Sequence, residues 1–260
     1  MPVAVLSALA WLLLLAARIA DQGVIEAAAD GVAYSVLINT RFGHDWIVRL
    51  GIALFLAAIL FRRPGELRAT WQDRVSPLVA AGLLGSIAWS GHAGASPGMV
   101  GALHLVSDFV HLVAVGAWIG ALPPLAILLS FSLQPANHAL KDAVTLAAHH
   151  FSTLAMLSVA ALAVTGIINT SNLAGTVPAL VDTEYGRLLL LKILLFIAIL
   201  GPAAVNRLRL LPRLPATDAI RRLRRNVLLE IGLATAIVLI VGALGTMPPG
   251  EHIQSEPHIH

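Results

Sequence analysis

Long runs of apolar residues dominate the chain, and short polar segments separate them. Seven of these runs approach or reach the roughly 20 residues that a helix needs to cross a bilayer. Only helices and closed barrels satisfy their backbone groups inside lipid. The pattern therefore predicts an all-α, polytopic transmembrane helix bundle of about seven helices. Its expected spans lie near residues 2–20, 45–61, 76–91, 101–130, 149–170, 186–206 and 226–247.

Three local features refine this prediction. The fourth run contains Pro123 and Pro124, which predict a kink, or a helix end followed by a re-entrant turn, because proline cannot donate a helical hydrogen bond. Residues 24–39 are too polar to span and are expected to form a helix on the outer surface. Residues 1–20 lack a basic start and an evident cleavage site, so we interpret them as a retained helix.

The composition agrees with a membrane protein. Of the 260 residues, 58% are hydrophobic and 12% are charged, and the mean hydropathy is +0.84. A soluble domain carries roughly twice that share of charge. The net charge is +3, but the cations lie in short loops between apolar runs, so topology explains them and nucleic acid is not an expected partner. The chain has no cysteine, which excludes disulfides, thiolate metal sites and thiol catalysis.

The basic residues predict the orientation. Twelve of the 17 cations fall in loops that would share one side of the membrane, and the positive-inside rule places that side in the cytoplasm. The N-terminus is then cytoplasmic and the C-terminus periplasmic. We expect one transmembrane domain over residues 1–250 and an external, histidine-containing tail over residues 251–260. The twelve are Arg62, Arg63, Arg68, Arg74, Lys141, Arg207, Arg209, Arg213, Arg221, Arg222, Arg224 and Arg225.

Histidine and methionine gather on the external side of this topology. The fourth run carries His104, Asp108 and His111, whose spacings of four and three residues place them on one helix face. Ionisable residues inside a span usually face a bundle interior or a cavity. The other external candidates are His44, His92, Met99 and Met247.

The face of the fourth run suggests a stepped path. His104 and His111 would lie roughly 10 Å apart along the axis, too far for one ion to bind both easily. Asp108 lies between them and could bind metal, orient an imidazole or accept a proton. His92 and Met99 could converge with His104 at the outer mouth. The alternative for each histidine is an interhelical hydrogen bond without metal, and methionine is a common gap filler.

Imidazole and thioether together suit copper, and methionine favours Cu(I) over Cu(II). Three further charges lie within or near spans: Arg187, Lys192 and Glu230. Arg187 and Lys192 could extend to the interface, and Lys192 could also pair with Asp108. For Glu230 we expect pairing with the adjacent arginines, with a proton relay as the weaker alternative.

Several short segments follow one another in a recognisable order. They are Arg41-Phe42-Gly43-His44, Ser90-Gly91-His92-Ala93, Leu103-His104-Leu105 through His111 to Trp118-Ile119-Gly120, Phe151-Ser152, Thr165-Gly166-Ile167-Ile168-Asn169, Tyr185-Gly186-Arg187 through Lys192, Asn206-Arg207-Leu208 and Gly245-Thr246-Met247-Pro248-Pro249. Together they resemble the CopD family of copper-resistance membrane proteins, over most of the chain from about residue 10 to 250. The resemblance implies a bacterial inner-membrane protein that moves copper inward, with a periplasmic copper-binding partner of the CopC type.

Three functions compete. The first is a copper permease with lipid and the CopC-type protein as partners. The second is a haem b electron-transfer protein, in which His104 or His111 would need an axial partner such as His92 or His149. The third is a copper sensor or storage subunit without flux. The sequence contains no nucleotide-binding loop, nucleophile elbow or zinc-protease helix motif, so we expect no enzyme. The oligomeric state stays open.

Overall fold

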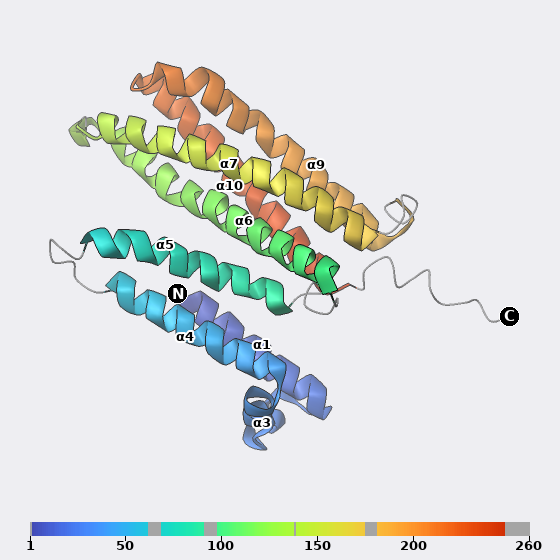
Figure 1. Cartoon of the computed structure of the whole chain (residues 1–260). Coiled ribbons are helices and arrows are strands. Elements are labelled where there is room, and N and C mark those ends of the chain that lie inside the picture. The colour runs from blue at the N-terminus through green and yellow to red at the C-terminus, as the bar shows by residue number, and fades with distance from the viewer. Residues whose placement is uncertain (1, 62–68, 91–97, 138, 175–180, 248–260) are drawn as a thin grey trace. The chain divides into compact units, whose positions relative to one another are not determined.

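The structure is a computed structural model and describes residues 2–61, 69–90, 98–137, 139–174 and 181–247. Within these ranges the chain forms helices and no strand (Figure 1). The helices are α1 (Pro2–Ala20), α2 (Val24–Ala29), α3 (Val32–Asn39), α4 (Arg41–Phe61), α5 (Ala69–Gly85), α6 (Gly98–Ser132), α7 (Leu140–Ala174), α9 (Glu184–Val205) and α10 (Thr217–Leu244).

Each of the seven predicted spans falls on one of these helices, which confirms a helical membrane bundle. Five described helices are long and apolar enough to cross a membrane: α4, α6, α7, α9 with the turns after it, and α10. The described apolar part of α1 and the 17 residues of α5 are shorter than the others. A count of about seven spans therefore stays a prediction.

The double proline does not end α6. The helix runs from Gly98 to Ser132 with Pro123 and Pro124 inside it, so the expected alternative of a helix end with a re-entrant turn is wrong, while the alternative of a kink stays a prediction. Leu122 and Leu125 flank the prolines, and both side chains are buried in the same core cluster. Because this packing fixes the helix on both sides, it outweighs the hydrogen bonds that the prolines remove.

Residues 24–39 form two short helices where one was expected. The break lies at Gly31, whose φ of +73° is in the left-handed region that favours glycine. Thr40 then links α3 to α4, and its hydroxyl accepts a hydrogen bond from the Gly43 backbone N–H at 3.0 Å. This threonine acts as the N-cap of α4 and fixes where the fourth helix begins.

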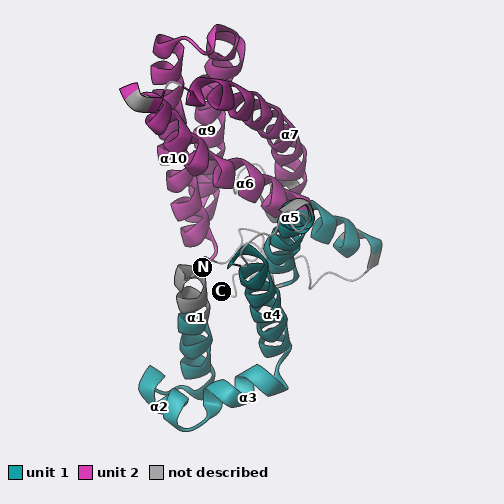
Figure 2. Cartoon of the chain, turned by 90° about the vertical axis from the view of Figure 1, so that its left-hand side faces the viewer, with its two compact units in different colours: residues 1–109 teal, residues 110–260 magenta. Residues whose placement is uncertain are grey.

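The chain divides into two compact units, residues 1–109 and 110–260 (Figure 2). α6 contributes its first residues to the first unit and the rest to the second. In the first unit, Leu12 and Ala16 of α1 form a buried cluster with Val36 of α3 and Trp46 of α4. The expected single domain over residues 1–250 stays a prediction, and the tail at residues 251–260 lies outside the described residues.

The second unit has two buried apolar clusters. One joins α6, α7 and α10 through Leu122, Val144 and Ile220, and the other surrounds Trp118 and Ile199. α9 and α10 lie side by side along much of their length (Figure 1). In this four-helix arrangement, the inward faces of α6, α7, α9 and α10 come together, so a polar residue on those faces must find its partner inside the protein.

Arg49 shows how the first unit satisfies a polar side chain inside a membrane span. Arg49 lies on α4, and its Nη2 donates to the Ser86 carbonyl at 2.6 Å while its Nε donates to Ser86 Oγ at 3.2 Å. Ser86 begins the short 3-10 helix Ser86–Ser90 that follows α5. The guanidinium therefore links α4 to the end of α5.

Close packing of α4 on α3 depends on Gly43, which is buried. A Cβ at this position would overlap the main-chain carbonyls of Val36 and Leu37. We predict that Gly43→Ala destabilises the protein by about 1–3 kcal/mol, because backbone atoms cannot move aside as a flexible side chain can. Thermal unfolding of the purified protein in detergent measures this.

Gly51→Ala is the matched control, since Gly51 is exposed on the same helix and a Cβ there meets nothing within 4 Å. It should leave stability unchanged or raise it slightly, because alanine favours helix over glycine. Equal unfolding midpoints for both variants would contradict the packing argument.

Candidate functional site

The predicted polar face of α6 holds a histidine and a carboxylate one turn apart. His104 Nε2 lies 3.9 Å from Asp108 Oδ2, and the two side chains are 11% and 25% exposed. This distance is too long for a hydrogen bond. His104 Nε2 is buried and has no hydrogen-bond partner in the part of the chain that the structure describes. An unsatisfied buried nitrogen raises the free energy of the folded state, so a ligand that bound it would stabilise this site.

The spacing of His104 and Asp108 fits a shared ion. Metal–nitrogen and metal–oxygen bonds are roughly 2 Å, so two ligands of one ion lie at most about 4 Å apart. The observed 3.9 Å is just inside that limit and would give a wide angle at the metal. Among the described residues no three His, Cys, Asp or Glu side chains group as a metal site. The pair is therefore part of a ligand set and needs further donors.

His111 is held by α7 in the second unit. Its Nδ1 lies 2.8 Å from Thr165 Oγ1, and that hydroxyl donates its only hydrogen to the Ala161 carbonyl at 2.7 Å. Thr165 can then only accept, so His111 Nδ1 must carry the proton. This tautomer leaves a lone pair on His111 Nε2. An oriented neutral imidazole of this kind is the usual form of a metal-binding histidine.

The other predicted charges of the second unit lie on α9. Lys192 is half-buried and interacts electrostatically with His111. Arg187 is exposed in the first turn, where its Nε donates to the Thr183 carbonyl at 3.4 Å. A pairing of Lys192 with Asp108 stays a prediction.

The remaining candidates come from separate segments of the chain. Met99 is 82% exposed in the first turn of α6, and His44 is exposed in the first turn of α4. Met247 is half-buried just beyond α10, within the second unit. His92 lies outside the described residues. The convergence of His92, Met99 and His104 at an outer mouth therefore stays a prediction.

Glu230 is completely buried on α10, and its described hydrogen-bond partner is an asparagine. Asn206 Nδ2 donates to Glu230 Oε1 at 2.7 Å, and Asn226 Nδ2 donates to Asn206 Oδ1 at 2.8 Å. Glu230 Oε2 is buried without a hydrogen-bond partner in the described part of the chain. The structure thus places Glu230 in an amide network, and the expected pairing with the neighbouring arginines is wrong.

Sequence reasoning missed two partners, Thr165 and Asn206. In the sequence both stand out only as members of the segments that resemble the CopD family. Asn206 opens a π-helical turn, Asn206–Leu210, directly after α9. Such turns insert one extra residue and are frequent at functional sites. In the sequence, the amide Asn206 directly follows the apolar run of α9, and the acid Glu230 lies on the next helix. A polar pair of this kind at neighbouring apolar runs could have suggested the contact.

A bundle of long apolar helices that holds ionisable side chains in its interior defines a multi-pass membrane protein. A family model described as copper resistance protein D matches residues 146–244, and one described as copper resistance protein D-like, N-terminal domain, matches residues 1–102. The chain belongs to the copper resistance protein D family, and its function is therefore related to copper at a membrane. Neither matched range includes His104, Asp108 or His111.

Three relatives match most of the chain. Copper resistance protein D of Pseudomonas syringae pv. tomato is 28% identical over 84% of this chain and 72% of its own length. Inner membrane protein YebZ of Escherichia coli (strain K12) is 24% identical over 83% of this chain and 72% of its own length. Copper transport protein CutJ of Bacillus subtilis (strain 168) is 25% identical over 92% of this chain and 42% of its own length. No solved structure matches.

The network of Asn206 and Glu230 yields a stability prediction. Glu230→Ala leaves the Asn206 amide buried without its acceptor, and we expect a loss of about 1–3 kcal/mol. Asn206→Ala should lose a similar amount. Because both variants remove the same hydrogen bond, the double variant should lose less than the sum by about 0.5–3 kcal/mol. Thermal unfolding in detergent measures all three.

Thr235→Ala is the control, because Thr235 is exposed on α10 and bonds within its own helix, to the Ile231 carbonyl. It should change stability by no more than about 0.5 kcal/mol. Strictly additive losses for Asn206→Ala and Glu230→Ala would show that the two side chains do not stabilise each other.

Proposed function

We propose that this protein carries copper across the bacterial inner membrane, taking it up from the periplasm through His104, Asp108 and His111 of α6. The observation that carries the proposal is the buried His104 Nε2, which lacks a hydrogen-bond partner among the described residues and lies 3.9 Å from Asp108 Oδ2. A purely structural histidine inside a span would be hydrogen-bonded. A histidine nitrogen without a hydrogen bond, beside a carboxylate, can bind a cation as it moves through the protein.

His111 supplies a second step along the same helix. Seven residues separate it from His104, which corresponds to roughly 10 Å of helix rise. Thr165 fixes its ring so that a lone pair remains on Nε2. Two separate weak positions favour movement over storage, because an ion must leave each site as readily as it enters.

The source of the copper and the orientation of the chain are inferred from the family and from the sequence. Copper reaches the outer face on a CopC-type periplasmic protein, and His44, His92, Met99 and Met247 offer imidazole and thioether donors for the transfer. The N-terminus is cytoplasmic and the C-terminus periplasmic, as the basic loops predict. One relative bears the name copper transport protein, which favours transport over a sensing role.

Copper flux into proteoliposomes tests the proposal. Purified protein is reconstituted, Cu(I) or Cu(II) is supplied outside, and copper inside is measured over time. His104→Ala should lower the initial rate by about tenfold or more, because it removes one of the two donors of the pair. His150→Ala is the matched control, since His150 is exposed on α7 and belongs to neither pair. It should transport like wild type.

Three outcomes contradict the proposal in different ways. Equal rates for His104→Ala and wild type would remove α6 from the path. Tight copper binding without flux would identify a sensor or storage protein. A haem absorption band in the purified protein would support the electron-transfer alternative.

A further inference from the structure

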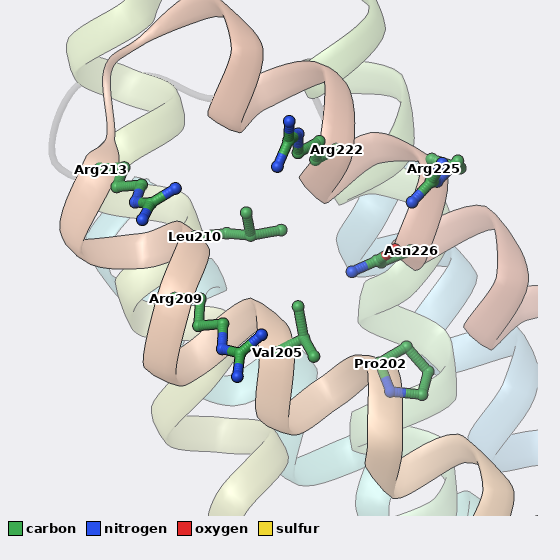
Figure 3. A pocket seen from close by; sticks show the side chains of 8 residues that line it. All are labelled: Pro202, Val205, Arg209, Leu210, Arg213, Arg222, Arg225 and Asn226. Carbon is green, nitrogen blue, oxygen red and sulfur yellow. The ribbon is translucent and has the colours of Figure 1, made fainter.

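Four arginines surround one cavity in the second unit. The cavity has a volume of about 500 Å³ and lies between the end of α9, the turns after it and the first half of α10 (Figure 3). Its volume is within the roughly 300–1,000 Å³ of ligand pockets. Its basic lining consists of Arg209, Arg213, Arg222 and Arg225.

These four guanidinium groups have no hydrogen-bond or ion-pair partner in the described part of the chain, whereas two neighbouring arginines do. Arg207 Nη1 donates to Ser152 Oγ at 2.8 Å, and Arg224 Nε donates to Ser130 Oγ at 2.7 Å. Two arginines of this segment are therefore bonded to serine side chains, and four others line the cavity. Membrane topology requires basic residues here, but it does not require four of them around one hollow.

No acidic side chain is among the residues that line the cavity. Asp218 in the first turn of α10 makes no ion pair within 4.0 Å with any described residue, and the buried Glu230 accepts a hydrogen bond from Asn206. Four like charges around one space repel each other, and an anion between them would lower the electrostatic energy of the site. Guanidinium groups match phosphate oxygens with paired N–H donors, so phosphate is the anion that this lining suits.

The rest of the lining indicates where the phosphate comes from. Pro202 and Val205 of α9 line the cavity beside the arginines, so one side of it is apolar. Val205 is 38% exposed and Leu208, in the next turn, is 72% exposed. Such a surface beside a basic pocket, at the end of a membrane-spanning helix, is where a lipid headgroup and its acyl chains would lie.

We propose that this cavity binds the phosphate group of an anionic phospholipid headgroup. Asn226 also lines the cavity, and its amide bonds to Asn206, which bonds to Glu230. The site therefore connects through two hydrogen bonds to the buried acid of α10. This inference does not depend on the path of copper through α6.

Lipid titration of the full-length protein in neutral detergent tests the proposal, with native mass spectrometry as the readout. Phosphatidylglycerol is the probe and phosphatidylcholine the neutral comparison. Arg222→Gln should weaken phosphatidylglycerol binding about fivefold, and Arg213→Gln/Arg222→Gln by roughly 25-fold, as each removes one charge near the phosphate. Arg221→Gln removes the same charge from the adjacent, exposed position that does not line the cavity. It should bind like wild type.

Unfolding midpoints without lipid show whether a variant is folded, and the exposed arginine variants should match wild type there. Equal losses for Arg221→Gln and Arg222→Gln would overturn the proposal, because the charge of the whole segment and not the cavity would then attract lipid. Equal binding of phosphatidylcholine would also overturn it. Inorganic phosphate that bound as tightly as phosphatidylglycerol and displaced it would keep the phosphate site and reject lipid as its source.

Discussion

Satisfaction of polar groups inside an apolar bundle is the constraint on which the rest of this structure depends. Lipid offers no hydrogen bonds, so a polar side chain within a span must find its partner on a neighbouring helix. Arg49 with Ser86 and His111 with Thr165 meet this requirement, and both pairs hold helices in register. Among the described residues the requirement is unmet at His104 Nε2, Trp118 Nε1 and Glu230 Oε2. The histidine nitrogen and the carboxylate oxygen can each bind a proton, an ion or a ligand, whereas the indole N–H can only donate.

The hydropathy of the sequence predicted the helices well because crossing a bilayer is a one-dimensional requirement on length and polarity. Every expected span overlaps a described helix, although several helices begin or end some residues away from the expected bounds. Helix periodicity likewise placed His104 and Asp108 on one face of α6. Neither signal reports which helices face each other, so Thr165, 54 residues from His111, could not be identified as its partner.

Glu230 and the prolines of α6 show how local rules mislead. Proximity along the chain suggested an arginine partner for Glu230, but its face of α10 packs toward Asn206 at the end of α9. Pro123 and Pro124 suggested a kink or a helix end, and α6 does not end there because buried leucines pack on both sides of the prolines. In both cases a tertiary contact outweighed the preference that neighbouring residues express, and such contacts are not visible in a single sequence.

The arginine-lined cavity also bears on any cation that moves through the second unit. Arg222, Asn226 and Glu230 are spaced by four residues on α10, so one helix face joins the cavity to the buried acid. Four positive charges that have no ion-pair partner among the described residues would repel a copper ion that approached this cavity. A bound anionic headgroup would offset part of this charge and lower that barrier. A lipid phosphate in this position would therefore act on ion movement through charge alone, without touching His104 or His111.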